Sequence, residues 1–185
     1  MLSAKAIEQL GLRVGKIWDE ALNRRATEAA AFDSAYDRAI QRLHVAARSR
    51  CEIESTLQRD GHDQSVIEDV LERLTTLRAV DDEALGRALI QETLARQVAG
   101  SQLLRAKLLR RGLCGELAER LVVEACRDAD PLADAAALAH QRRQSMAKLD
   151  ARTQKRRLWG LLARRGFEAE IIEAALADLA ADDIG

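Results

Sequence analysis

The residues of this sequence best suited to chemistry are arginines and lysines, clustered in two segments that end at Gly112 and Gly166. Guanidinium and ammonium groups in such clusters bind phosphates or carboxylates through charged hydrogen bonds. The alternative is a solvated face that keeps a chain rich in Ala and Leu in solution. The candidate partner-binding residues are Arg105, Lys107, Arg110, Arg111, Arg152, Lys155, Arg156, Arg157, Arg164 and Arg165.

The distribution of charge indicates what these residues would bind. The net charge is −1, but nine basic residues and one acid lie between Arg142 and Arg165. From Glu168 to Gly185 there are six acids and no base. Such asymmetry favours an acidic protein or a nucleic acid as partner. Aromatic residues make up 3% of the chain, so stacking platforms for bases are missing and a protein partner is the stronger expectation.

Other reactive residue types do not form a catalytic pattern. The histidines lack companions at metal-ligand spacing, and the three cysteines are scattered. Asp81-Asp82 fits a helix N-terminus better than an acid/base pair, because no further catalytic group is near in sequence. No phosphate-binding loop, nucleophile elbow or HExxH motif occurs. We therefore predict a protein that is not an enzyme and that needs no cofactor or metal.

Cysteine usage and hydropathy predict the cellular location. An odd, scattered set of cysteines is typical of a reducing compartment, and no apolar run reaches membrane-spanning length. A signal-peptide apolar segment is also missing at the N-terminus. We expect a cytoplasmic monomer that does not contact the membrane.

The basic segments belong to a repeat that must position them. Gly61, Gly112 and Gly166 stand 51 and 54 residues apart. A large aliphatic residue lies eight and four residues before each glycine, and another ten residues after it. Helix-forming residues dominate, with one proline in the chain. The pattern predicts an all-α fold, an elongated, curved array of three tandem three-helix repeats after a short helical lead-in.

Helix-capping residues set the expected boundaries of the helices. In the lead-in we expect one helix from Ala4 to Leu10 and a second from Trp18 or Asp19 to about Ala31. The first repeat would then begin at Asp33 or Ser34. The expected domains are a lead-in at 1–34, repeat 1 at 35–80, repeat 2 at 81–129 and repeat 3 at 130–185.

Three further caps are predicted inside the repeats. Ser49 and Glu52 have the spacing of a capping box at the start of a middle helix. Ser101 is expected to cap the equivalent helix of the second repeat. Asp130-Pro131 has the pattern of an N-cap followed by proline in the first turn.

Five motifs in order along the chain resemble the RecX family. Each is weak alone, but the five occur in register over essentially the whole length. Leu85-Gly86 departs from the family pattern, which has an aromatic residue followed by Ala. The motifs are Gly11-Leu12-x2-Gly15, Ala39-x3-Leu43-x5-Ser49-x2-Glu52-Ile53-x3-Leu57-x3-Gly61, Val80-Asp81-Asp82-x2-Leu85, Leu104-x3-Leu108-x3-Gly112-Leu113 and Leu162-Ala163-Arg164-Arg165-Gly166-Phe167.

The resemblance implies a regulator that binds the RecA recombinase and its filament on single-stranded DNA. Such a protein would restrain ATP hydrolysis, strand exchange and co-protease activity, in the setting of DNA repair and the SOS response. The alternative is a helical-repeat protein that binds single- or double-stranded DNA without RecA. A scaffold for an unrelated partner is the third interpretation.

Overall fold

The computed structural model describes residues 7–8, 11–13 and 18–181. Within these ranges the regular structure is entirely helical, with nine helices, α2 to α10, and no strand. The predicted all-α class is confirmed. The helix predicted from Ala4 to Leu10 falls largely outside the described residues. The chain divides into two compact units, one ending at Leu85 and the other beginning at Gly86.

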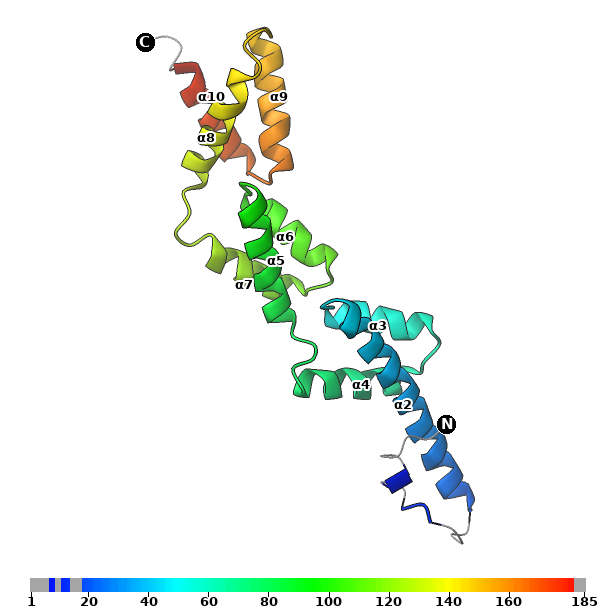
Figure 1. Cartoon of the computed structure of the whole chain (residues 1–185). Coiled ribbons are helices and arrows are strands. Elements are labelled where there is room, and N and C mark those ends of the chain that lie inside the picture. Colours follow the sequence, from blue (N-terminus) through cyan, green and yellow to red (C-terminus); the bar gives the residue numbers. More distant parts are fainter. Residues whose placement is uncertain (1–6, 9–10, 14–17, 182–185) are drawn as a thin grey trace. The chain divides into compact units, whose positions relative to one another are not determined.

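The first unit is built on one long helix. Helix α2 (Glu20–Val45) packs against α3 (Arg50–Arg59) and α4 (Gln64–Thr76), as Figure 1 shows. The predicted break between a lead-in helix and a first-repeat helix near residues 31–34 is wrong. No glycine or proline occurs within α2, and its alanine-rich middle favours continuation. The helix begins where the second lead-in helix was predicted to begin, at Asp19, whose carboxylate accepts a 2.7 Å hydrogen bond from the Leu22 amide.

The start of α3 is a complete capping box, as predicted. The Glu52 amide donates to the Ser49 hydroxyl at 3.1 Å, and the Ser49 amide donates to the Glu52 carboxylate at 3.0 Å. Asp81 and Asp82, the acidic pair predicted at a helix N-terminus, add two further hydrogen bonds. Asp81 caps α5 (Asp82–Arg96) by accepting from the Ala84 amide at 2.8 Å, and Asp82 accepts from the Arg50 amide at 2.8 Å. The two acids therefore stabilise helix ends.

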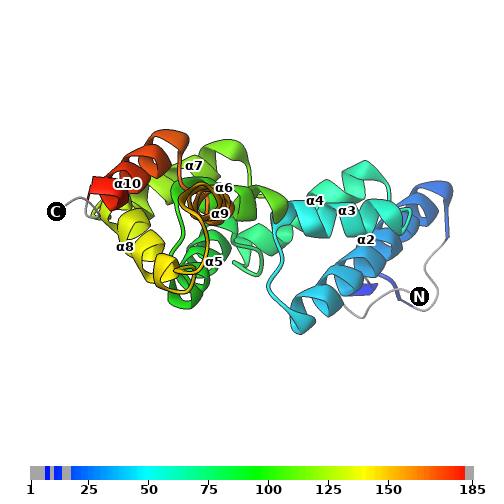
Figure 2. The same ribbon diagram turned by 90° about the horizontal axis from the view of Figure 1, so that it is seen from above.

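The second unit contains the third repeat and the second repeat from Gly86 onward. Helices α8, α9 and α10 pack against one another and α6 packs against α7, while Gly86 of α5 lies close to Leu113 and Leu121. Figure 2 views α9 almost along its axis with α8 and α10 beside it. Asp130 accepts from the Leu132 and Ala133 amides, so the cap predicted before Pro131 is confirmed. The helices are α5 (Asp82–Arg96), α6 (Ser101–Arg110), α7 (Gly115–Ala125), α8 (Pro131–Gln144), α9 (Ala151–Arg164) and α10 (Ala169–Ala181).

The periodic residues of the sequence form the cores of the repeats. All nine aliphatic residues at the three periodic positions are buried, which confirms the alignment of the repeats: Ile53, Leu57, Leu71, Leu104, Leu108, Val122, Leu158, Leu162 and Leu176. Trp159 packs against the third core from a half-buried position, as expected. Each periodic glycine has a positive φ, 85° at Gly61, 76° at Gly112 and 82° at Gly166, and so ends the middle helix of its repeat.

Candidate partner-binding surface

Helix α9 exposes the densest group of the predicted basic residues. Asp150 starts this helix by accepting a 3.0 Å hydrogen bond from the Thr153 amide, while Leu158 and Leu162 fix its buried side. All charged residues on the rest of the helix are basic, and residues 151–165 include no acid. Five of the ten candidate residues are exposed here: Arg152, Lys155, Arg156, Arg157 and Arg164.

Helical geometry divides these five residues into groups. Arg152 and Arg156 are four residues apart, and Arg157 and Arg164 are seven apart, so each pair stacks along one line of the helix. Both lines lie on the exposed side, and Lys155 lies between the buried stripe and the line of Arg152 and Arg156. Like charges at four-residue spacing destabilise an isolated helix slightly. Such an arrangement is favourable when an anionic partner covers it.

Arg105 is held within the second repeat. Its Nε lies 2.6 Å from Oε2 of Glu119, and its terminal nitrogen Nη2 lies 2.9 Å from Oε1. The two parallel bonds join α6 to α7. The hydrogen bond from Arg105 lowers the pKa of Glu119, and the same bond raises the pKa of Arg105. A bidentate pair of this kind leaves little of the guanidinium for a partner.

Lys107 is also engaged inside the repeat. Its ammonium nitrogen donates a 3.0 Å hydrogen bond to the hydroxyl of Thr93, which is buried in α5. The aliphatic stem of a half-buried lysine covers apolar surface while its charge satisfies a polar group. Lys107 thus connects α6 to α5.

Arg165 belongs to the joint between the second and third repeats. Its Nη1 donates to the Val98 carbonyl at 3.2 Å, and its own carbonyl accepts from the Gly100 amide at 2.8 Å. The Gly166 carbonyl accepts from the Gln102 amide at 3.1 Å. The turn after α9 therefore supplies the cap of α6.

This joint changes the predicted start of α6. The N-cap is Gly100 and has no side-chain cap bond, so the prediction that Ser101 caps the helix is wrong. Ser101 is the first helical residue, and its hydroxyl donates to Glu168 of the third repeat at 3.3 Å. The carbonyls that cap α6 therefore belong to a distant segment, since Arg165 follows Gly100 by 65 residues in the sequence.

The last two candidate residues lie at the end of α6. Arg110 is exposed on its final turn, and Arg111 is half-buried at its C-cap. In the first repeat the equivalent helix α3 carries Glu52 and Glu54, and Asp60 follows it. Basic character is therefore a property of the second and third repeats.

Arg143 is a basic residue that the candidate set omitted. It lies near the end of α8, and its Nη1 donates to the Leu179 carbonyl at 2.9 Å. The signal was the basic run that begins at Arg142 and continues into α9. Its contact with α10 depends on the packing of the third repeat, which the sequence pattern does not specify.

The described part of the chain offers no arrangement for metal chemistry. Among those residues, no three side chains of the His, Cys, Asp and Glu types come together in a way that could hold an ion. Burial raises the pKa of the Cys126 thiol, which disfavours its reactive thiolate form. None of the described helices combines the length and apolarity needed to cross a membrane.

Comparisons with known proteins identify the first and third repeats. The profile described as "RecX, first three-helix domain" matches residues 35–74, and "RecX, third three-helix domain" matches residues 128–176. "Regulatory protein RecX" of Prosthecochloris aestuarii is 33% identical over 145 residues, which cover 78% of this chain and 93% of that protein. The chain belongs to the RecX family.

Other RecX proteins differ in length. The relative from Geobacillus thermodenitrificans is 34% identical over 167 residues, 90% of this chain but 62% of the relative. The chain thus spans about three fifths of that protein. The crystal structure of RecX from Lactobacillus salivarius matches with a TM-score of 0.70 at 18% identity, over 83% of this chain and 99% of that one. A second structure, of a regulatory protein RecX, gives 0.79 at 19% identity, over 95% and 88%. The fold is therefore that of RecX.

Proposed function

We propose that this protein regulates the RecA recombinase by binding RecA and its filament on single-stranded DNA. Family membership supports this proposal, because the matched relatives are named regulatory proteins. The observation on the molecule that carries it is the exposed, acid-free arginine surface of α9. A filament presents acidic protein groups and phosphates along its length, and both attract such a surface.

The proposed effect is inhibition or modulation of ATP hydrolysis, strand exchange and co-protease activity. Binding along a polymer can act at a low ratio of regulator to RecA, because one bound molecule affects its neighbours in the filament. The regulator itself carries out no reaction. It would act in the cytoplasm, in homologous recombination, DNA repair and the SOS response.

The decisive measurement is the ATPase rate of RecA on single-stranded DNA, titrated with this protein. We expect inhibition well below one regulator per RecA. The double variant R156E/R157E should weaken it, whereas R24E/R25E should not. The control changes the same charge at two adjacent, exposed arginines of α2. Inhibition that persists in R156E/R157E would remove α9 from the binding surface, and no effect of excess wild-type protein would refute the proposal.

A second candidate function is DNA binding without RecA. The arginine rows of α9 also suit phosphates, and they favour this alternative equally. It predicts tight binding of this protein alone to DNA, with an affinity that falls steeply as salt rises. DNA binding without any change in RecA activity would select this alternative.

A further inference from the structure

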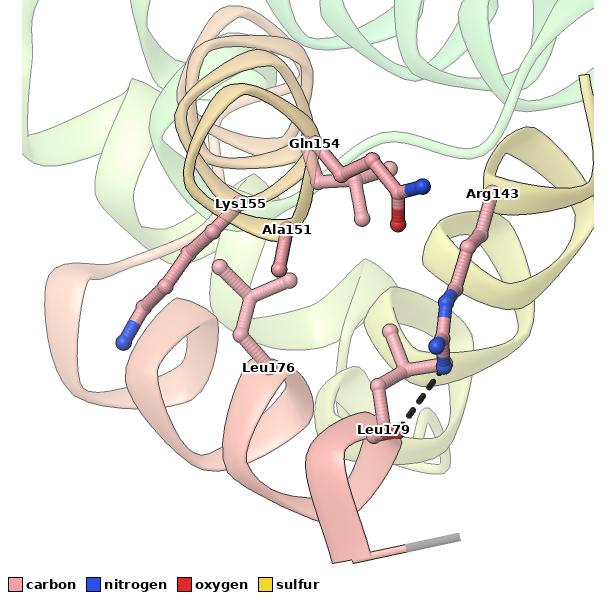
Figure 3. Close-up of a pocket in the computed structure, with 7 residues that line it drawn as sticks. Arg143, Ala151, Gln154, Lys155, Leu176 and Leu179 are labelled. Carbon is pink, nitrogen blue, oxygen red and sulfur yellow. Dashed lines mark hydrogen bonds between the residues drawn. The ribbon is translucent and has the colours of Figure 1, made fainter. Parts of the chain in front are cut away.

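The third repeat has a cavity at the beginning of α9. Its volume is about 150 Å³, and it opens between α8, α9 and α10 (Figure 3). Four of its seven lining residues are apolar and form the floor: Ala151, Leu158, Leu176 and Leu179. A volume of that order accommodates one benzene-sized or leucine-sized group.

Polar groups surround the apolar floor on three sides. Figure 3 shows Arg143 and Lys155 on opposite sides of the opening, with Leu176 and Ala151 between them. The side-chain amide nitrogen of Gln154 donates two hydrogen bonds, to the Met146 and Leu149 carbonyls at 3.0 and 2.9 Å. Its amide oxygen is left as an acceptor beside the cavity.

The charge at this opening is predominantly positive. No acid lines the cavity, and the neighbouring segment adds the exposed Arg142, Lys148 and Arg152 against one acid, Asp150. An apolar side chain entering the floor would therefore be best accompanied by carboxylates. A phosphate alone would leave the apolar floor exposed to water.

The second repeat uses the same end of its middle helix as a docking surface. Gln154 and Lys155 stand 12 and 11 residues before Gly166, as Gly100 and Ser101 stand before Gly112. In the second repeat these positions receive the segment Arg165–Glu168. Gly100 binds its backbone, and Ser101 binds the carboxylate of Glu168 at 3.3 Å. The equivalent end of α9 carries the open cavity, where side chains replace the backbone donors because the Gln154 backbone amide already donates to the Asp150 carbonyl.

We propose that this cavity binds a peptide segment of a protein partner in which an aliphatic side chain is flanked by carboxylates. The aliphatic side chain enters the floor formed by Leu158, Leu176 and Leu179, and the carboxylates face the exposed Lys155. This assignment deepens the proposed function by naming the kind of peptide segment that the cavity binds. It rests on the proposed function in one respect, that the partner is a protein.

The test uses the full chain and three fluorescein-labelled pentapeptides. The first is Glu-Asp-Leu-Asp-Glu, the second replaces Leu by Gly, and the third replaces every acid by its amide. Fluorescence anisotropy should show saturable binding of the first peptide, with each of the others weaker by about tenfold or more. Equal affinity for the Leu and Gly peptides would refute the role of the floor.

Variants of the protein locate the binding. Lys155→Glu should weaken binding of the first peptide by about tenfold, whereas Lys148→Glu, an identical change outside the cavity, should have little effect. Ala151→Phe should fill the opening and abolish binding without changing a core residue. Equal loss in Lys148→Glu and Lys155→Glu would reduce the effect to general attraction and overturn the site.

Two further results, each showing a different occupant of the cavity, would also overturn the proposal. Tighter peptide binding by D182N/D183N would assign the opening to carboxylates of this same chain. Self-association that the first peptide reverses, measured by sedimentation velocity, would assign it to a second copy. The peptide assay does not involve RecA, so the two proposals fail separately. Peptide binding without any effect on RecA would support the cavity assignment and refute the proposed function. An effect on RecA without peptide binding would support the proposed function and refute the cavity assignment.

Discussion

The amide nitrogen of Gly100 donates a 2.8 Å hydrogen bond to the carbonyl oxygen of Arg165. The bond joins the N-cap of α6, the middle helix of the second repeat, to the C-cap of α9, the middle helix of the third repeat. It is accompanied by a very close backbone approach. A Cβ atom on Gly166 would lie 2.1 Å from the Leu103 amide nitrogen, and one on Gly100 would lie 2.3 Å from the Gly166 carbonyl oxygen. Both residues must be glycine for the repeats to meet in this way.

The first prediction concerns this joint. Gly166→Ala should lower the free energy of unfolding by clearly more than Gly61→Ala. Both glycines have φ near 80°, so both variants carry a cost of about 1 kcal/mol for a side chain in that conformation. A Cβ on Gly61 meets no atom within 4 Å, whereas on Gly166 it meets backbone. Urea unfolding of the two variants measures the difference, and equal losses would contradict the close approach.

The second prediction separates two serines that the sequence pattern treats alike. Ser49→Ala should cost about 1 kcal/mol of stability, because it removes the capping box of α3. Ser101→Ala should cost markedly less, because the cap of α6 consists of backbone carbonyls from the third repeat. Thermal and urea unfolding of both variants provide the comparison. A larger loss in Ser101→Ala would show that the serine is the cap after all.

The third prediction distinguishes paired from exposed arginines in anion binding. If the protein binds DNA through α9, Arg156→Gln should reduce the salt dependence of that binding by about one unit of log–log slope, because it would remove one phosphate contact. Arg105→Gln should leave that slope unchanged and lower stability instead, since Arg105 is bonded to Glu119. Glu119→Gln should raise the affinity by releasing Arg105. A fall in slope for Arg105→Gln as large as that for Arg156→Gln would contradict this division.

The fourth prediction is a dependence of stability on pH at the start of α9. Hydrogen bonds from Thr153, its backbone amide foremost, lower the pKa of Asp150. A carboxylate whose folded pKa is lowered adds stability that is fully present above its unfolded pKa and is lost as pH falls through the folded pKa. Wild type should therefore lose stability relative to Asp150→Asn as the solution is acidified below about pH 4.

Fluorescence of Trp159 in a Trp18→Phe background reports this change, because Trp159 lies on α9. Urea unfolding at a series of pH values gives the difference between the two proteins. A difference that stays constant between neutral and acidic pH would show that the Asp150 carboxylate contributes nothing to the cap.

Much of the fold follows from residue types at fixed spacing. Leu57, Leu108 and Leu162 are buried because each shares one face of its helix with the aliphatic residue four positions earlier. The Ser49 cap was predictable because both partners lie within four residues. The cap of α6 was not, since its acceptors at Arg165 and Gly166 are distant in sequence. The continuity of α2 was also missed, because Asp33 and Ser34 are good caps that also occur within helices.

The candidate site was predictable as a charge pattern but not as a set of available groups. Sequence spacing identifies the basic segments, yet Arg105 and Arg156 look equivalent in it. Their difference arises from Glu119, which lies on another helix and was not part of the pattern. Lys107 and Arg165 likewise have partners that only packing brings near them.

Helix α9 begins about one turn further from its periodic glycine than α6 does. This extra turn affects how such proteins could lengthen by gene duplication. The second repeat accepts its neighbour through the amides of Gly100 and Gln102, which have no acceptor within their own helix. At the equivalent position in the third repeat, the backbone amide of Gln154 already donates to the backbone carbonyl of Asp150 at the start of α9. A copied module placed after the third repeat would find no matching donors there. Extension of the array by the same joint would first require the loss of the turn from Ala151 to Gln154.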